Sequence, residues 1–181
     1  MRKYRLLAPG PTPIPPEVLQ ALSRPILHHR TPEFEALFAR VRGGLARLLE
    51  TRSEVMVLAA SGTGAMEAAV VNLLSPGDEA IVVSCGKFGE RWTQVCRAFG
   101  IRVHAVEAPY GETVPPGQVA DALGAHPGAR VLFATQSETS TGVLQDIEGY
   151  AALTRRTDTL LVVDTVSSFG VVPCPMDAWG V

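Results

Sequence analysis

The segment Ser61-Gly62-Thr63-Gly64-Ala65-Met66-Glu67 has the composition of an anion-binding turn. It separates an apolar run at 54–60, typical of a strand, from an apolar-periodic run at 64–74, typical of a helix. At such a junction, free backbone N–H groups and the positive end of the helix dipole face one point. Thr63 adds a hydroxyl, and the two glycines let an anion approach the backbone. We expect a phosphate group as the ligand.

Two phosphate-binding motifs are excluded by neighbouring residues. A dinucleotide-binding turn has a third glycine, where Glu67 stands, and an acid after the next strand, where this chain has Ser84 and Cys85. This argues against NAD and against an adenosyl ligand. A Walker loop needs Gly-Lys-Ser/Thr, but Phe88 follows the only Gly-Lys pair. Alone, the turn is equally consistent with a tight strand–helix junction.

Length and charge set broad limits on the protein class. A chain of 181 residues predicts one domain with a substantial core. A net charge of −2 does not indicate binding to nucleic acid or to an anionic membrane. Three cysteines without C-x-x-C spacing indicate a reduced, cytoplasmic protein. No apolar stretch has the length of a signal peptide or a membrane span.

From residue 54 onward, strand and helix patterns alternate, which predicts an α/β fold. The sheet is expected to be mostly parallel, with helices on both faces. The expected strands are 54–60, 79–85, 101–107, 130–136 and 159–164, and the expected helices are 64–74, 89–98, 117–124 and 147–156. Ligands of such sheets collect beyond the carboxyl ends of the strands, so the residues that follow each strand matter most.

The first 50 residues have a different character. Residues 8–16 are proline-rich and predict an extended arm, which either lies over the body or reaches an active site or a partner subunit. A short helix is expected at 16–22, and an amphipathic helix is expected after Thr31, its N-cap. His28 and His29 are adjacent on a loop without a third ligand nearby, so we predict no metal site there.

The segments that follow the strands have complementary chemistry. Besides the phosphate turn they offer aromatic residues at 86–92, hydroxyls at 137–142 and a carboxylate at Asp164. This combination suits pyridoxal 5′-phosphate, whose phosphate needs a cradle, whose ring needs a flat neighbour and whose pyridine nitrogen needs an acid. Asp164 at the mouth of a buried strand is placed for that role, although an aspartate there is also a common turn cap.

Taken in order, six segments resemble the class V (fold-type I) aminotransferases, in the alanine–glyoxylate/serine–pyruvate branch. Each segment is weak alone, but the order and the intervals match the family over nearly the whole chain. The segments are Ala8-Pro9-Gly10-Pro11-Thr12, His29-Arg30-Thr31-Pro32-Glu33-Phe34, Ser61 to Ala68, Gly86-Lys87-Phe88-Gly89-Glu90-Arg91, Glu138-Thr139-Ser140-Thr141-Gly142-Val143 and Val163-Asp164-Thr165-Val166-Ser167-Ser168.

The resemblance implies a cofactor site. The phosphate would be held by Thr63, Gly64 and Ala65. Phe88 matches the ring-stacking aromatic, with Trp92 as the second choice. Thr139 matches the hydroxyl residue beside the ring, Asp164 matches the partner of the pyridine nitrogen, and Val166 matches a contact on the ring's other face.

The resemblance also implies a substrate contact and an assembly. The family's N-terminal Gly-Pro arm lies near the substrate carboxylate, which assigns Gly10 to that region. A homodimer is implied, with sites at the interface.

One feature of the family is absent. Its Schiff-base lysine follows a strand beyond Val181, and this chain has only Lys3 and Lys87. We therefore expect the front part of an aminotransferase, inactive alone, with an arm and short helix at 1–30 and part of the cofactor-binding large domain at 31–181.

For the complete protein, the resemblance implies transfer of an amino group from alanine or serine to a 2-oxo acid such as glyoxylate or pyruvate. The identity of donor and acceptor is left open. Alternatives within the fold are a cysteine desulfurase, a phosphoserine aminotransferase and a hydrogenase-associated subunit. The desulfurases typically stack a histidine where this chain has Phe88. A non-catalytic scaffold that binds phosphate is the alternative from a different class.

Overall fold

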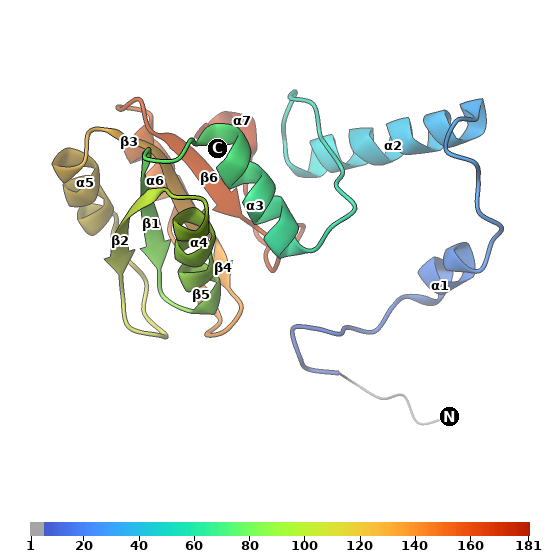
Figure 1. Cartoon of the computed structure of the whole chain (residues 1–181). Helices are drawn as coiled ribbons and strands as arrows, with labels where there is room; N and C mark the ends of the chain where they lie inside the picture. Colours follow the sequence, from blue (N-terminus) through green and yellow to red (C-terminus); the bar gives the residue numbers. More distant parts are fainter. Residues whose placement is uncertain (1–5) are drawn as a thin grey trace.

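The computed structural model describes residues 6–181, and its centre is a four-stranded parallel sheet in the order β2-β1-β3-β6 (Figure 1). The strands are β1 (Glu79–Ser84), β2 (Arg102–Glu107), β3 (Ala129–Thr135) and β6 (Leu160–Asp164). Their pairing is parallel throughout. The predicted α/β fold with a parallel sheet is confirmed.

Helices cover both faces of this sheet. One apolar cluster joins α3 (Gly62–Leu73) and α4 (Lys87–Ala98) to alternate strand residues such as Val82 and Phe133. The other joins α5 (Pro116–Ala125) and α6 (Ile147–Thr154) to the intervening residues, such as Ile81 and Leu132. Successive side chains of a strand point to opposite faces, so short, continuously apolar strands build both clusters at once.

The observed elements lie within a few residues of the expected ranges, with one error. The predicted strand at 54–60 is wrong, because these residues form extended chain without strand pairing. Met56 is 82 % and Leu58 52 % exposed. A strand requires a neighbour for its backbone N–H and C=O groups, and within residues 6–181 none lies beside this segment. Elements that the sequence patterns did not predict are the β4–β5 hairpin (Ser137–Glu138 and Val143–Leu144) and α7 (Met176–Trp179).

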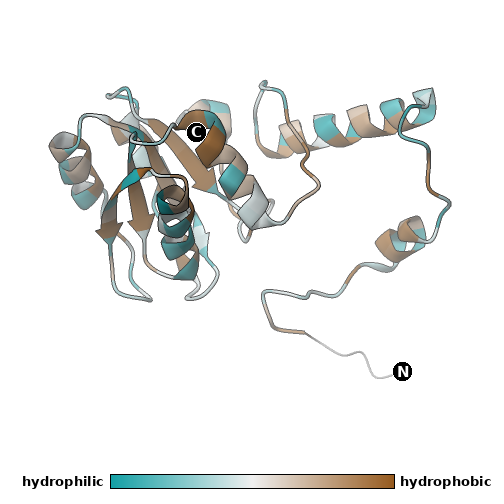
Figure 2. Cartoon of the chain, in the orientation of Figure 1, coloured by the Kyte–Doolittle hydropathy of each residue, from teal (hydrophilic) through white to brown (hydrophobic). Residues whose placement is uncertain are grey.

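Residues 6–60, here called the N-terminal segment, project from residues 61–181, here called the sheet body (Figure 1). The segment contains α1 (Pro16–Leu22) and α2 (Pro32–Leu48). As predicted, Thr31 caps α2, and its hydroxyl accepts the Phe34 N–H at 3.3 Å. No residue from 6 to 65 is buried. Figure 2 shows apolar residues gathered in the strands and also on the exposed α1.

Few polar contacts connect the N-terminal segment to the sheet body. The Met176 N–H donates to the Leu49 carbonyl at 3.0 Å, and Thr51 Oγ1 donates to Asp177 at 2.6 Å. Among residues 6–181, no helix combines the length and apolar character that crossing a bilayer requires.

Candidate active site

The first turn of α3 has the features of an anion site. Ser61 caps the helix, and its hydroxyl accepts the Gly64 N–H at 3.4 Å. The N–H groups of Gly62 and Thr63 point out of the helix end, where no preceding carbonyl can accept them. A Cβ at Gly64 would lie 2.7 Å from the Cβ of Ala60, so only glycine fits this tight entry to the helix. The helix dipole adds partial positive charge at the same point.

A cavity of about 380 Å³ lies between this helix and the end of β6. Ala65 and Met66 line it from α3, Trp92 lines it from α4, and residues 162–166 line it from β6 and the loop that follows. The structure thus brings Ala65 together with Asp164 and Val166, which lie about a hundred residues later in the sequence. Parallel strands place the loops after their carboxyl ends on one edge of the sheet, which explains this convergence.

Asp164 is the carboxylate of this cavity. It is half-buried at the end of β6, and its Oδ1 accepts the Val166 N–H at 2.8 Å. Burial raises the pKa of Asp164, the Val166 N–H opposes this shift, and the nearby charge of Glu138 adds to it. A carboxylate whose charge is poorly solvated gains most from a cationic partner, and a protonated pyridine nitrogen is such a partner.

Glu138 is a positioning residue beside the site whose role the sequence analysis missed. Its side chain is only 1 % exposed. Its Oε2 accepts the N–H groups of Phe88 and Gly89, each at 3.1 Å, and its Oε1 accepts the Ser140 hydroxyl at 2.6 Å. The carboxylate therefore caps the N-terminus of α4 and fixes the backbone of Phe88.

The fit around Glu138 depends on a neighbouring glycine. A Cβ at Gly86 would lie 2.5 Å from both Glu138 Cγ and Ser140 Oγ. The available sequence signal was a glutamate three residues after the end of the buried strand β3, followed by hydroxyl residues. That pattern cannot by itself indicate which helix the carboxylate reaches.

The two aromatic candidates occupy different environments. Phe88 is 39 % exposed at the start of α4 and is not among the residues that line the cavity. Trp92, one turn later, is 2 % exposed, lines the cavity and stacks on Phe133 with ring centroids 4.5 Å apart. Its indole N–H has no hydrogen-bond partner within residues 6–181. Of these two aromatic residues, Trp92 therefore contributes the flat apolar surface of this cavity.

The remaining candidates are not among the residues that line the cavity. The Thr139 hydroxyl hydrogen-bonds that of Ser167, which ties the β4–β5 hairpin to the loop after Asp164. Lys87 pairs with Glu90 at 2.8 Å on the surface. Gly10 is exposed on the arm with no heavy atom within 4 Å of its Cβ position, so the structure does not bring it to the cavity. Lys3 lies outside the described residues.

The parallel sheet, the helix start with free N–H groups and the half-buried carboxylate of Asp164 at one edge define a cofactor-binding α/β domain. The chain belongs to the class V aminotransferase family, whose model matches residues 5–181.

Individual relatives agree with this assignment. The chain is 42 % identical to the soluble hydrogenase small subunit of Synechococcus sp. (strain PCC 6716), with 98 % of this chain and 47 % of the relative covered. It is 40 % identical to the L-aspartate–glyoxylate aminotransferase of Paracoccus denitrificans (strain Pd 1222), with 97 % and 46 % covered. The crystal structure of an alanine–glyoxylate aminotransferase from Nostoc sp. superposes with a TM-score of 0.93 at 37 % identity, with 100 % and 48 % covered. The chain thus spans about half the length of these relatives.

The residues present fit pyridoxal 5′-phosphate, the cofactor of this family. The N-terminal turn of α3 offers unpaired N–H groups for a phosphate, and Asp164 offers a carboxylate in the same cavity. A Cβ on Gly62 would lie 3.3 Å from Val166 Cγ2, so a side chain at Gly62 would crowd the passage between these two groups.

Proposed function

We propose that the protein containing this chain is a pyridoxal phosphate-dependent aminotransferase, which moves an amino group from a small amino acid to a 2-oxo acid such as glyoxylate or pyruvate. The main support is the single cavity that holds both the start of α3 and Asp164. Two relatives are named for glyoxylate with different amino donors, aspartate in Paracoccus denitrificans (strain Pd 1222) and alanine in Rattus norvegicus. Our prediction from the sequence is alanine or serine.

In this proposal each site residue has one task. Thr63, Gly64 and Ala65 bind the phosphate at the helix start. Bound pyridoxal phosphate supplies an electron sink for the bonds at the amino-acid Cα. Asp164 keeps the proton on the ring nitrogen, because the buried carboxylate is stabilised by the positive charge opposite it.

The other assigned residues orient the cofactor and the substrate. Val166 lines the cavity and would bound one face of the ring, whereas Phe88 lies outside the cavity lining and would have to turn inward to bound the other face. Thr139 would lie beside the ring, and Gly10 would approach the substrate carboxylate. Trp92, which already lines the cavity, would take the stacking role if Phe88 stays outside. Glu138 positions Phe88 through its backbone without touching the cofactor.

Residues 1–30 are proposed to be an arm and 31–181 the front part of the large domain of a cytoplasmic homodimer. The support is the exposed apolar surface of the N-terminal segment, where Ile26 is 98 % and Leu22 70 % exposed. Apolar surface of this kind is typical of a region that another chain or domain covers. A second copy that extends its arm across the interface would bring Gly10 toward a cavity that its own chain does not reach.

A hydrogenase-associated subunit is the second candidate. It is favoured by one observation, the 42 % identity to hydrogenase subunits from Synechococcus sp. (strain PCC 6716) and Anabaena cylindrica. The same cavity could bind the cofactor in such a subunit without amino transfer.

Two measurements test these proposals. Pyridoxamine 5′-phosphate needs no lysine for binding, so it should bind the 181-residue chain and quench Trp92 fluorescence, with weaker binding in Thr63→Val. Trp179, the other tryptophan, lies in α7, and a Trp179→Phe background isolates the signal.

In the complete protein, alanine or serine with glyoxylate should give turnover, which Asp164→Asn lowers about 100-fold or more. Cofactor binding without turnover would favour the hydrogenase-associated subunit, and absence of both would exclude the aminotransferase assignment.

A further inference from the structure

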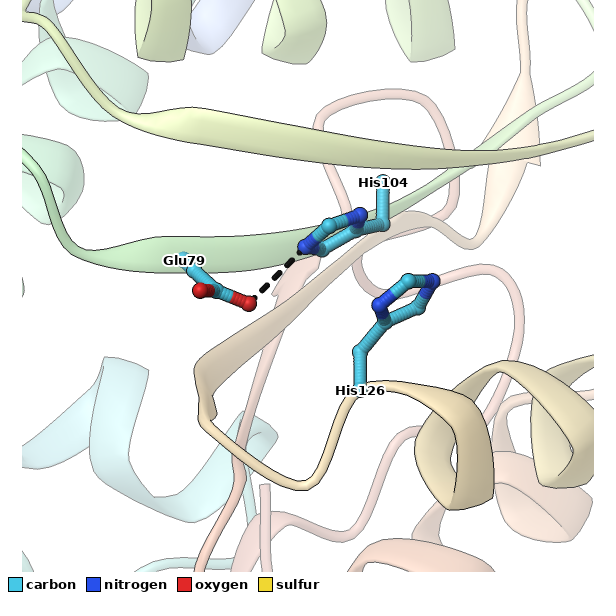
Figure 3. A group of neighbouring side chains, drawn as sticks. All are labelled: Glu79, His104 and His126. Atoms are coloured by element: carbon cyan, nitrogen blue, oxygen red, sulfur yellow. Dashed lines mark hydrogen bonds and ion pairs between the residues drawn. The ribbon is translucent and has the colours of Figure 1, made fainter.

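A second cluster of polar side chains lies toward the end of the sheet opposite to the candidate active site. Glu79 begins β1, His104 is the third residue of β2, and His126 directly follows α5 (Figure 3). One ligand atom from each residue lies within 4.8 Å of the other two. Asp164 and Phe88 follow the carboxyl ends of their strands, whereas Glu79 stands at an amino end. The cluster is therefore separate from the candidate active site.

Sheet register and helix packing create this cluster. Glu79 is paired with Arg102, and His104 lies two residues further along β2. The side chains of Arg102 and His104 are therefore on the same face of the sheet as the side chain of Glu79. Nε2 of His104 lies 3.0 Å from Oε2 of Glu79. The other carboxylate oxygen, Oε1, accepts from Arg102 at 2.7 Å, which fixes the carboxylate with Oε2 facing the histidines.

The third side chain completes a compact set of ligands. The rings of His126 and His104 stack with centroids 3.5 Å apart and planes within 11° of parallel. Figure 3 shows a nitrogen of each ring directed to the side where Glu79 lies. All three residues are half-buried, so an ion there would be partly shielded from water yet reachable from solvent.

We propose that Glu79, His104 and His126 form a binding site for a divalent transition metal of the Zn²⁺ type. Two imidazoles and one carboxylate are ligands that such ions prefer, whereas Mg²⁺ and Ca²⁺ require mostly oxygen ligands. With metal–ligand bonds of about 2.0–2.1 Å, tetrahedral ligand atoms stand about 3.3 Å apart. The His104–Glu79 pair, at 3.0 Å, is close to this spacing. Because the nitrogen lone pair lies in the ring plane, the His126 ring has to rotate out of its parallel stack with His104 for both imidazoles to bind one ion. Water fills the open position.

Binding in this site is expected to stabilise the edge of the sheet. The ion replaces the proton between His104 and Glu79 and links β1, β2 and the end of α5. Within residues 6–181, β2 is an edge strand that pairs only with β1, so a cross-link to the adjacent helix end restrains one edge of the sheet. Arg102 acts from outside the ligand set and keeps Glu79 oriented.

The test is a Zn²⁺ titration of tag-free, chelator-treated protein against a chromophoric chelator, with the thiols alkylated. One Zn²⁺ should bind per chain, Mg²⁺ should not compete, and saturation should raise the Tm by about 5 °C. His104→Asn with His126→Asn should weaken binding about 100-fold or more. The matched control is His28→Asn with His29→Asn, which removes an equally large pair of stacked imidazoles that has no carboxylate in its group. This control should bind as the unmodified protein does.

Equal binding by the His104/His126 variant, or an equal loss in the His28/His29 control, would overturn the proposal. If the double variant does not fold, Glu79→Gln replaces it, with the same expected direction of change. Co²⁺ added to the unmodified protein provides an independent readout. Intense visible absorption of a four-coordinate ion without thiolate charge-transfer bands supports the site, and a weak six-coordinate spectrum contradicts it.

Discussion

The N-terminal segment and the sheet body have similar sequence patterns but differ in how deeply their apolar side chains are buried. Both contain capped, amphipathic helices. In the sheet body these helices close two apolar clusters, in which residues such as Phe133 and Val70 are fully buried. In the N-terminal segment no residue is buried, although α2 presents a regular apolar face. A local pattern is thus sufficient to specify a helix, whereas burial depends on where the complementary surface lies.

The largest contrast is expected from deletion of one aromatic ring in each region. Phe133→Ala removes a fully buried ring that stacks on Trp92, so it should lower the free energy of unfolding by about 3–5 kcal/mol. Phe34→Ala in α2 removes a half-buried ring that contacts Phe38, and about 1 kcal/mol or less is expected. Urea unfolding followed by circular dichroism measures both. Similar losses would show that the N-terminal segment packs as firmly as the sheet body.

A charged residue provides the next test of the sheet body. Glu138→Ala should cost about 3 kcal/mol, because the N–H groups at the start of α4 lose their acceptor in a buried place. The control is Glu90→Ala, in the same helix, which removes a half-buried surface carboxylate that pairs with Lys87 and accepts the Tyr110 hydroxyl, so it should lower the urea midpoint much less than Glu138→Ala does. A small effect of Glu138→Ala would mean that water reaches this helix end.

The same contrast explains which parts of the fold could be predicted from the sequence. The strands at 79–84 and 160–164 are short apolar runs between turn residues, and their positions were predicted within a few residues. The run at 54–60 has the same composition, but it forms no strand. Strand formation depends on hydrogen bonds to a neighbouring strand, and composition contains no information about that neighbour.

Prediction of the candidate site had a similar limit. Asp164 and the turn at 61–67 could be proposed because each follows from a local rule, a carboxylate after a buried strand and glycines at a helix start. The role of Glu138 depends on contacts across about fifty residues of sequence. The Glu79–His104–His126 cluster likewise results from strand register and the end of α5, which no spacing rule specifies.

Within the sheet body, Asp164 is expected to reduce stability in exchange for function. Because burial raises the pKa of Asp164, its charged form is less favourable in the native state than in the unfolded chain, and this lowers the stability of the cofactor-free protein at a pH where the carboxylate is ionised. Asp164→Asn retains an acceptor for the Val166 N–H, so it should raise the Tm at pH 7 by about 1–3 °C.

The pH dependence of this gain checks its cause. On acidification Asp164 takes up its proton at a higher pH in the native state than in the unfolded chain, so the difference in Tm between Asp164→Asn and the unmodified protein should shrink as the pH falls. Thermal scans at pH 7, 5.5 and 4 follow this trend. A gain that grows on acidification would mean that the Asp164 charge is stabilised in the fold, contrary to the direction given by its burial.

The smallest effect on chain stability is expected in the N-terminal segment, at Ile26. Its side chain is 98 % exposed, so Ile26→Ser should change the free energy of unfolding of the isolated chain by less than about 0.5 kcal/mol. If a second copy covers this surface, the same substitution should weaken the dimer of the complete protein about 10-fold or more, since a buried isoleucine contributes about 1.5–3 kcal/mol.

Sedimentation equilibrium of the complete protein measures the dimer, with Phe99→Ser as the control. Phe99 is an apolar side chain, 41 % exposed, at the end of α4 in the sheet body. Loss of the dimer in Ile26→Ser alone would locate the interface on the N-terminal segment. Loss in Phe99→Ser alone would place it on the sheet body, and the exposed face of α1 and α2 would then require another covering surface. Either result determines whether the helices of the N-terminal segment complete their packing in a second copy, as those of the sheet body complete theirs within one chain.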